Sequence, residues 1–272
     1  MNRLFVDRKN YQSRWLIVHF LLLSGFSLLA QKEYYTPKSL IMPFHDKEKQ
    51  LHISAGKGGG WDVNVSYAFS KHFSFFTAGT YDKGLKRRIT ILGDPFRIKK
   101  NDYAVRAGLG YFKKIDFGVF NILEFMGGAG TYKVQNYWYF TDANPYYELM
   151  YREYTNARFT SLFAQMQMAV KGHAGERALA LRFSYSRYRS FAVFDAYYSN
   201  TQTKLQNFWT VNIDPVASYS YYFKRFKLNV QSGVSIPLKK VRLEPPSIYE
   251  TVMLATVLGR LGIQYNLDLK NK

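Results

Sequence analysis

Strict two-residue alternation over residues 61–70 constrains the fold of this chain more than any other feature. Apolar or aromatic side chains occupy the odd positions from Trp61 to Phe69, and small or polar side chains occupy the even positions from Asp62 to Ser70. Successive side chains of a β-strand point to opposite faces, so this pattern predicts a strand with one apolar and one polar face. A helix would need apolar positions three and four residues apart.

The same pattern recurs along the chain and predicts ten strands. Clear alternation marks residues 61–70, 103–111, 179–185, 209–221, 226–230 and 261–267, and weaker alternation marks residues 50–57, 73–82, 116–132 and 157–170. Short connectors, such as 71–72 and 223–225, alternate along the chain with long connectors at 81–101, 133–156, 191–206 and 237–250. Only the first hairpin, at 58–60, is brief on the long side. An even number of strands with this layout is typical of bacterial outer-membrane barrels.

The residue types on the two faces separate a membrane barrel from a soluble one. A soluble barrel, such as a lipocalin-like one, has a polar exterior around an apolar interior. Here the face opposite the aromatic residues carries Gly, Ser, Ala, Asn, Gln and Thr, and most charges lie in the connectors. We therefore expect an all-β fold: an antiparallel up-and-down transmembrane β-barrel, with long external loops and short periplasmic turns.

The first thirty residues indicate export. Four basic residues precede the apolar run from Trp15 to Ala30. Sixteen residues rise about 24 Å as a helix, which is short of the roughly 30 Å hydrocarbon core, so a secretory signal peptide is favoured over a transmembrane helix. We expect a signal peptide at 1–30, a periplasmic lead-in at 31–49, the barrel at 50–269 and a short tail at 270–272. The lead-in, which contains Tyr34 and Tyr35, is expected either to plug the barrel mouth or to run along its base.

The last strand carries the clearest family resemblance. Its polar, glycine and hydrophobic positions resemble the signal that outer-membrane barrels present to the barrel-assembly machinery, and these positions are Arg260, Gly262, Tyr265 and Leu267. Residues 50–269 are similar to small outer-membrane β-barrel proteins of Gram-negative bacteria, of the porin-like and OmpX/OmpW-like general type. The chain departs from that pattern because it continues to Lys272. The resemblance implies the outer membrane as location, with its lipids and the assembly machinery as partners, but fold does not imply function.

Charged residues on the predicted inner face are nearly balanced in sign. They are Asp62, Arg106, Glu124, Arg182, Asp214, Lys227 and Arg260. In a ten-stranded barrel the lumen is little wider than side chains can fill, so one interpretation is a packed network of ion pairs. The other is a charged constriction that selects solutes.

Basic residues dominate the predicted connector 81–101. They are Lys83, Lys86, Arg87, Arg88, Arg97, Lys99 and Lys100. An exported barrel does not routinely meet nucleic acid, so the expected anionic partners are the phosphate groups of lipopolysaccharide. A merely solvated loop is the alternative.

Aromatic residues crowd the next predicted connector. The candidates are Tyr137, Trp138, Tyr139, Tyr146 and Tyr147. Such residues either anchor a barrel at the membrane interface or stack on glycans and protein partners. Both interpretations stay open.

The positions of the histidines argue against an enzyme. Enzymes among outer-membrane barrels resemble one another in needing a histidine near the external rim. Here His45 and His52 lie before or early in the first strand, and His72 and His173 occupy short turns. A Ser-His or Asp-His arrangement at the external end therefore cannot be assembled.

A site made only of carboxylates remains open, and its candidates are Asp94, Asp142, Glu148 and Asp195. Without cysteine and without a dense acidic loop, no metal or cofactor is expected. The expected function is a non-enzymatic barrel with a structural or surface-interaction role, and the alternative is a narrow porin-like channel.

Overall fold

The computed structural model describes residues 40–90, 93–140, 153–195, 201–239, 241 and 256–269. For some of these residues it describes the backbone only, namely 86–90, 93–97, 138–140, 153, 195 and 201–203. The expected signal peptide and C-terminal tail lie outside these ranges. No helix among the described residues is long and apolar enough to cross a membrane.

Strands make up nearly all of the described chain. They are β1 (Gln50–Lys57), β2 (Trp61–Ala68), β3 (Phe73–Thr90), β4 (Gly93–Phe117), β5 (Phe120–Phe140), β6 (Glu153–Lys171), β7 (Gly175–Asp195), β8 (Thr201–Leu205), β9 (Phe208–Phe223), β10 (Phe226–Pro237) and β11 (Thr256–Asp268).

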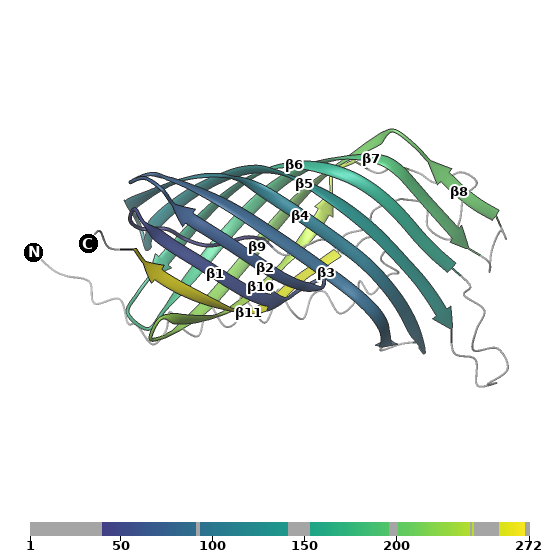
Figure 1. Ribbon diagram of the computed structural model, residues 1–272, viewed down its shortest axis with the longest axis horizontal. Helices are drawn as coiled ribbons and strands as arrows, with labels where there is room; N and C mark the ends of the chain where they lie inside the picture. The colour runs from purple at the N-terminus through teal and green to yellow at the C-terminus, as the bar shows by residue number, and fades with distance from the viewer. Residues whose placement is uncertain are drawn as a thin grey trace, which may run out of the picture.

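Ten of these strands close into an antiparallel barrel (Figure 1). Each of the ten pairs with the next one along the chain, and the barrel closes where β1 pairs with β11. β7 pairs directly with β9, because the short β8, which lies between them in the sequence, is not one of the ten. β8 pairs with the end of β7 and extends the barrel wall. The predicted ten-stranded antiparallel barrel is thus confirmed, and β8 is an additional strand within the predicted connector 191–206.

The two ends of the barrel differ. The turns between β2 and β3, β4 and β5, β6 and β7, and β9 and β10 are short, and they lie at the end where β1 begins and β11 stops, since Gln50 is paired with Asp268. We call this the terminal end and the opposite one the loop end. At the loop end β3 to β7 reach well beyond the short β1 and β2 (Figure 1).

The connectors at the loop end contain far more strand than the sequence analysis expected. Most of the predicted connector 81–101 is a β-hairpin, because β3 continues to Thr90 and β4 starts at Gly93. β5 likewise continues to Phe140, and β7 to Asp195. Cross-strand hydrogen bonds hold these extensions together without a membrane, so their outward positions need no apolar side chains and the expected alternation disappears there.

The barrel has an apolar exterior and a largely polar interior. On β2, Val63 is 55% exposed on the outside whereas Asn64 is 6% exposed on the inside. On β4 and β6 the outward Leu109 and Leu162 are 63% and 61% exposed. This reversal is the surface of a membrane barrel, and it confirms the predicted assignment of the two faces.

Candidate functional site

The lumen is filled at the terminal end by residues 40–45, which we call the plug segment. Its residues from Leu40 to Phe44 include four with 6% exposure or less that pack against inward-facing side chains of the wall. Its carbonyl at Ile41 accepts a hydrogen bond of 2.8 Å from Gln165 of β6. The sequence analysis left two paths open for the lead-in, and residues 40–45 follow the one that enters the barrel as a plug. Tyr34 and Tyr35 lie outside the described residues.

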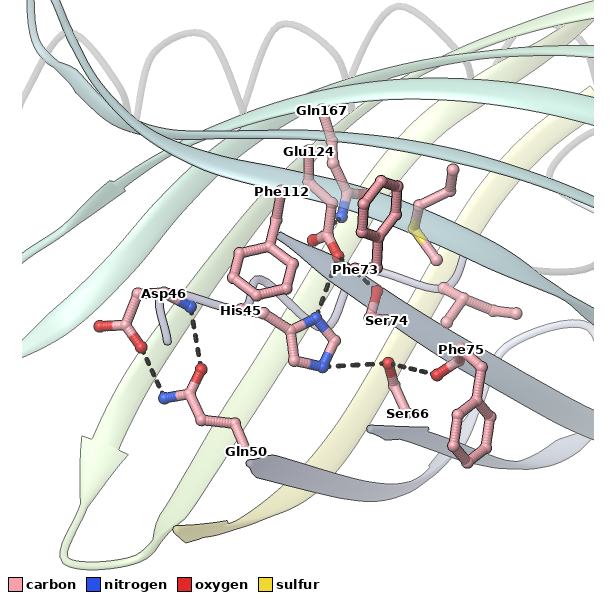
Figure 2. Close-up of polar contacts among 12 residues, drawn as sticks. His45, Asp46, Gln50, Ser66, Phe73, Ser74, Phe75, Phe112, Glu124 and Gln167 are labelled. Carbon is pink, nitrogen blue, oxygen red and sulfur yellow. Dashed lines mark hydrogen bonds and ion pairs between the residues drawn. The ribbon is translucent and has the colours of Figure 1, made fainter. Parts of the chain in front are cut away.

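The plug segment ends in a polar anchor at His45, which is fully buried (Figure 2). Its Nδ1 lies 3.0 Å from Glu124 Oε1, and its Nε2 lies 3.1 Å from Ser66 Oγ. The other carboxylate oxygen of Glu124 accepts a 2.8 Å hydrogen bond from Gln167. The His45 ring also stacks on His52, with ring centroids 4.6 Å apart.

Ser66, His45 and Glu124 follow the order of a nucleophile, a base and an acid. Access argues against that chemistry, because Ser66 is 2% exposed and the other two are not exposed. The cavity beside Ser66 measures about 20 Å³, which is room for about one water molecule. The Ser66 hydroxyl also donates to the carbonyl of Phe75 at 3.1 Å. The arrangement therefore holds the plug segment in place rather than presenting a nucleophile to a substrate.

Asp46, which directly follows the plug segment, also attaches this part of the chain to the barrel wall. Its carboxylate lies 3.0 Å from the ammonium of Lys171 and accepts a 2.5 Å hydrogen bond from Gln50. Burial alone disfavours the charged carboxylate, but the charge of Lys171 and these hydrogen bonds outweigh it and lower the pKa of Asp46.

The seven charged residues predicted for the inner face all lie inside the barrel, each 6% exposed or less. The structure joins two pairs among them: Arg260 with Asp62 at 2.8 Å and Arg182 with Asp214 at 2.7 Å. Arg260 also donates to Ser54 and to Asn229. This close pairing favours the packed network over an open charged constriction.

Two of the predicted charges find partners that the sequence analysis missed. Lys227 pairs with Glu176 of β7 at 2.8 Å, and Glu124 pairs with His45. Glu176 lies outside the strands predicted from alternation, and His45 lies in the predicted lead-in, so the sequence pattern places neither in the lumen. Glu124 itself could have indicated such a partner in the sequence, because a single acid in an apolar, glycine-rich strand needs a buried group to pair with.

Toward the loop end, aromatic rings of four neighbouring strands form a row on the inner face of the barrel wall. Tyr132 stacks on Phe159, Phe159 on Tyr188, and Tyr188 on Phe208, with ring centroids 4.5 to 4.6 Å apart. Phe191 and Val193 complete this apolar cluster. The sequence analysis does not predict the cluster, because it places Val134, Phe191 and Val193 in connectors.

The basic candidates of the hairpin between β3 and β4 divide between the two faces. Lys83 and Lys99 are exposed on the outer face. Lys100, in contrast, points inward with 3% exposure, and its Nζ lies 3.7 Å from Asp82 Oδ2. It therefore does not belong to the outer basic surface that the sequence analysis expected, since the strand places neighbours 99 and 100 on opposite faces. The side chains of Lys86, Arg87, Arg88 and Arg97 lie outside the described residues.

Among the aromatic candidates, Tyr137 is on the outer face and continues into a row of rings. Its centroid is 6.1 Å from that of Tyr154, which is 5.7 Å from that of Phe194. The side chains of the other aromatic candidates lie outside the described residues: Trp138, Tyr139, Tyr146 and Tyr147. So do those of the carboxylate candidates Asp94, Asp142, Glu148 and Asp195.

The residues of the expected assembly signal lie on β11. Arg260 and Gly262 face the lumen, and Tyr265 and Leu267 are partly exposed on the outside. Their role in assembly stays a prediction.

No protein-family model matches the chain, and no curated protein matches it. Among solved structures, the chain is similar to the outer-membrane protease OmpT from Escherichia coli, with a TM-score of 0.47, 9% identity, and coverage of 81% of this chain and 94% of that one. It is similar to the translocator domain of the autotransporter NalP from Neisseria meningitidis, with a TM-score of 0.37, 13% identity, and coverage of 79% and 86%. It is also similar to the KdgM porin, with a TM-score of 0.31, 12% identity, and coverage of 79% and 98%.

Proposed function

We propose that this protein is a non-conducting, non-enzymatic β-barrel of the outer membrane, exported by its N-terminal signal peptide. Its role is structural or depends on surface interactions at the loop end. The observation that carries the proposal is the plug segment, because a lumen filled by the chain itself leaves no continuous path for solutes.

Membrane placement follows from the exterior. About ten residues of each strand suffice to span a bilayer, and most of the outward side chains over that length are aliphatic or aromatic. A face of this kind is costly to expose to water over a whole barrel. The expected partners are therefore the lipids of the outer membrane, lipopolysaccharide among them, and the barrel-assembly machinery during insertion.

Closure is maintained by contacts that are costly to break. Removing one partner of a buried ion pair typically costs about 3–5 kcal/mol, and the lumen contains the pairs of Arg260, Arg182 and Lys227 as well as the His45 anchor. The apolar ring cluster lines one side of the lumen toward the loop end, where an apolar lining disfavours water and ions. The protruding wall of β3 to β7 is left as the surface for lipid, glycan or protein partners.

Single-channel recording in planar bilayers tests the proposal. The folded mature protein is expected to give no stable conductance. A variant lacking residues 31–45 removes the plug segment and serves as the matched comparison, in which openings are expected to appear or become more frequent. Stable openings of reproducible size in the unmodified protein would instead support the alternative, a narrow porin-like channel whose constriction is lined by Arg106, Arg182, Arg260 and Asp214.

A further inference from the structure

Four positive side chains gather on the outer face of β5, β6 and β7. Lys133 and Arg158 are direct cross-strand partners, and Arg158 is opposite Ser190 at a β-bulge that leaves the neighbouring Arg189 exposed. Arg187 lies two residues earlier on the same face. We call Lys133, Arg158, Arg187 and Arg189 the cationic patch.

No carboxylate among the described side chains balances this patch. Among the described side chains on the outer face of β3 to β7, from mid-barrel to the loop end, none is an aspartate or a glutamate. Lys83 and Lys99 extend the positive surface onto β3 and β4. Like charges directly opposite each other on a sheet are destabilising, so the Lys133–Arg158 pair is a cost that a bound anion would remove.

The patch adjoins an aromatic and apolar surface on its membrane side. Lys133 Nζ lies 5.9 Å from the ring centroid of Tyr103. Arg187 is the cross-strand partner of Trp209, whose ring is 5.8 Å from that of Tyr185. Aromatic rings of this kind mark the interface between acyl chains and head groups.

Below the rings, the outward side chains are apolar. Val105 is 53% exposed, Leu162 is 61% exposed and Phe183 is 46% exposed. An anion that meets the patch at this level and also covers these side chains must carry acyl chains. A free phosphate ion would leave the apolar part uncovered.

We propose that the cationic patch binds the phosphate group of an outer-leaflet glycolipid whose acyl chains lie along Leu162 and Phe183. Arginine recognises phosphate through two parallel hydrogen bonds, and three of the four residues are arginines. Arg189 lies on the same face as Arg187 because the two residues are two positions apart, and the bulge leaves both Arg189 and Ser190 exposed beside Arg158. The site rests on the proposed placement in the outer membrane.

The test measures glycolipid binding to the folded full-length mature protein in uncharged detergent micelles by native mass spectrometry. The probes are lipid A with its phosphates, the same lipid with its phosphates removed, and inorganic phosphate. The variant K133Q/R158Q removes two charges from the patch. The matched control K71Q/R225Q removes two charges from exposed turns at the terminal end.

Phosphorylated lipid A is expected to bind the unmodified protein and the control alike, and K133Q/R158Q is expected to bind it about tenfold or more weakly. Equal weakening in the control would show a general charge effect and overturn the site. Equal affinity for the dephosphorylated lipid would overturn phosphate recognition, and equal affinity for inorganic phosphate would overturn the choice of a lipid. All four substitutions lie at exposed or partly exposed positions, so the variants are expected to fold. Folding is checked by comparing the gel mobility of unheated and heated samples of each variant. A protein that conducts ions yet still binds phosphorylated lipid A through the patch would contradict only the closed lumen.

Discussion

At the residue scale, the most informative contact is the one between His45 and Glu124. Glu124 is buried, and it accepts hydrogen bonds from His45 and Gln167. These contacts join the plug segment to the barrel wall, so the same carboxylate supports both the wall and its filling.

Substituting Glu124→Ala is expected to lower the free energy of unfolding by about 3–5 kcal/mol, because it leaves the buried His45 and Gln167 without their acceptor. Urea unfolding in detergent micelles measures the change. The matched control is Asp268→Asn, which removes an acid whose pair with Lys47 is half exposed and is expected to change stability by less than about 1 kcal/mol. Equal effects of the two substitutions would contradict the anchoring role of Glu124.

A second contact at this scale depends on glycine. Gly108 of β4 pairs with Gly128 of β5 on the inner face, where the rings of Phe76 and Phe163 lie against them. A Cβ atom on Gly108 would overlap the backbone oxygen of Gly127 and lie 2.6 Å from Cζ of Phe76. The wall therefore needs a residue without a side chain at this position.

Gly108→Ala is expected to destabilise the barrel by about 1–3 kcal/mol, since the overlap involves backbone that cannot move aside. Gly79→Ala on the neighbouring strand is the control, because nothing lies within 4 Å of the added atom and no loss is expected. Thermal unfolding of both variants distinguishes overpacking from a general effect of replacing glycine in a strand.

At the element scale, the strands serve two different surroundings. Toward the terminal end, β3 and β4 present the apolar side chains of Phe75 and Leu109 on the outer face. Toward the loop end, the same two strands present Lys83 and Lys99 on that face. The hairpin of β3 and β4 at the loop end is held by its own cross-strand pairs, such as Leu85 with Lys99, and β4 also pairs there with β5, but β1 and β2 do not reach it. It should therefore be separable from the barrel.

Replacing residues 86–98 with an Asn-Gly turn between Leu85 and Lys99 is expected to leave a folded barrel, because these two residues already face each other and a two-residue turn fits such a pair. Circular dichroism and gel mobility before heating check the fold. A variant that fails to fold would show that the hairpin stabilises the barrel rather than only extending it.

At the scale of the whole molecule, the arrangement of faces is the reverse of that in a water-soluble protein. Ser, Asn, Gln and charged side chains fill the inside, and Leu, Val and aromatic side chains cover the outside. The mature protein is accordingly expected to remain with the membrane fraction in high salt and alkaline carbonate, and to need detergent for extraction. Recovery in the soluble fraction without detergent would contradict membrane placement.

The sequence by itself determined the strands and the direction of their side chains, as residues 61–70 illustrate. That information is local, because alternation along one strand follows from backbone geometry alone. It correctly assigned all seven charged candidates to the inside, and it failed for β3 beyond Tyr81, where strands without lipid around them no longer alternate.

Only the tertiary structure decided which inward residues meet. His45 and Glu124 are 79 residues apart in sequence, and Lys227 and Glu176 are 51 apart. Their contact depends on the stagger with which the barrel closes and on the path of the plug segment through it. The cationic patch has the same origin, because Lys133, Arg158 and Arg189 become neighbours only through the pairing of three long strands.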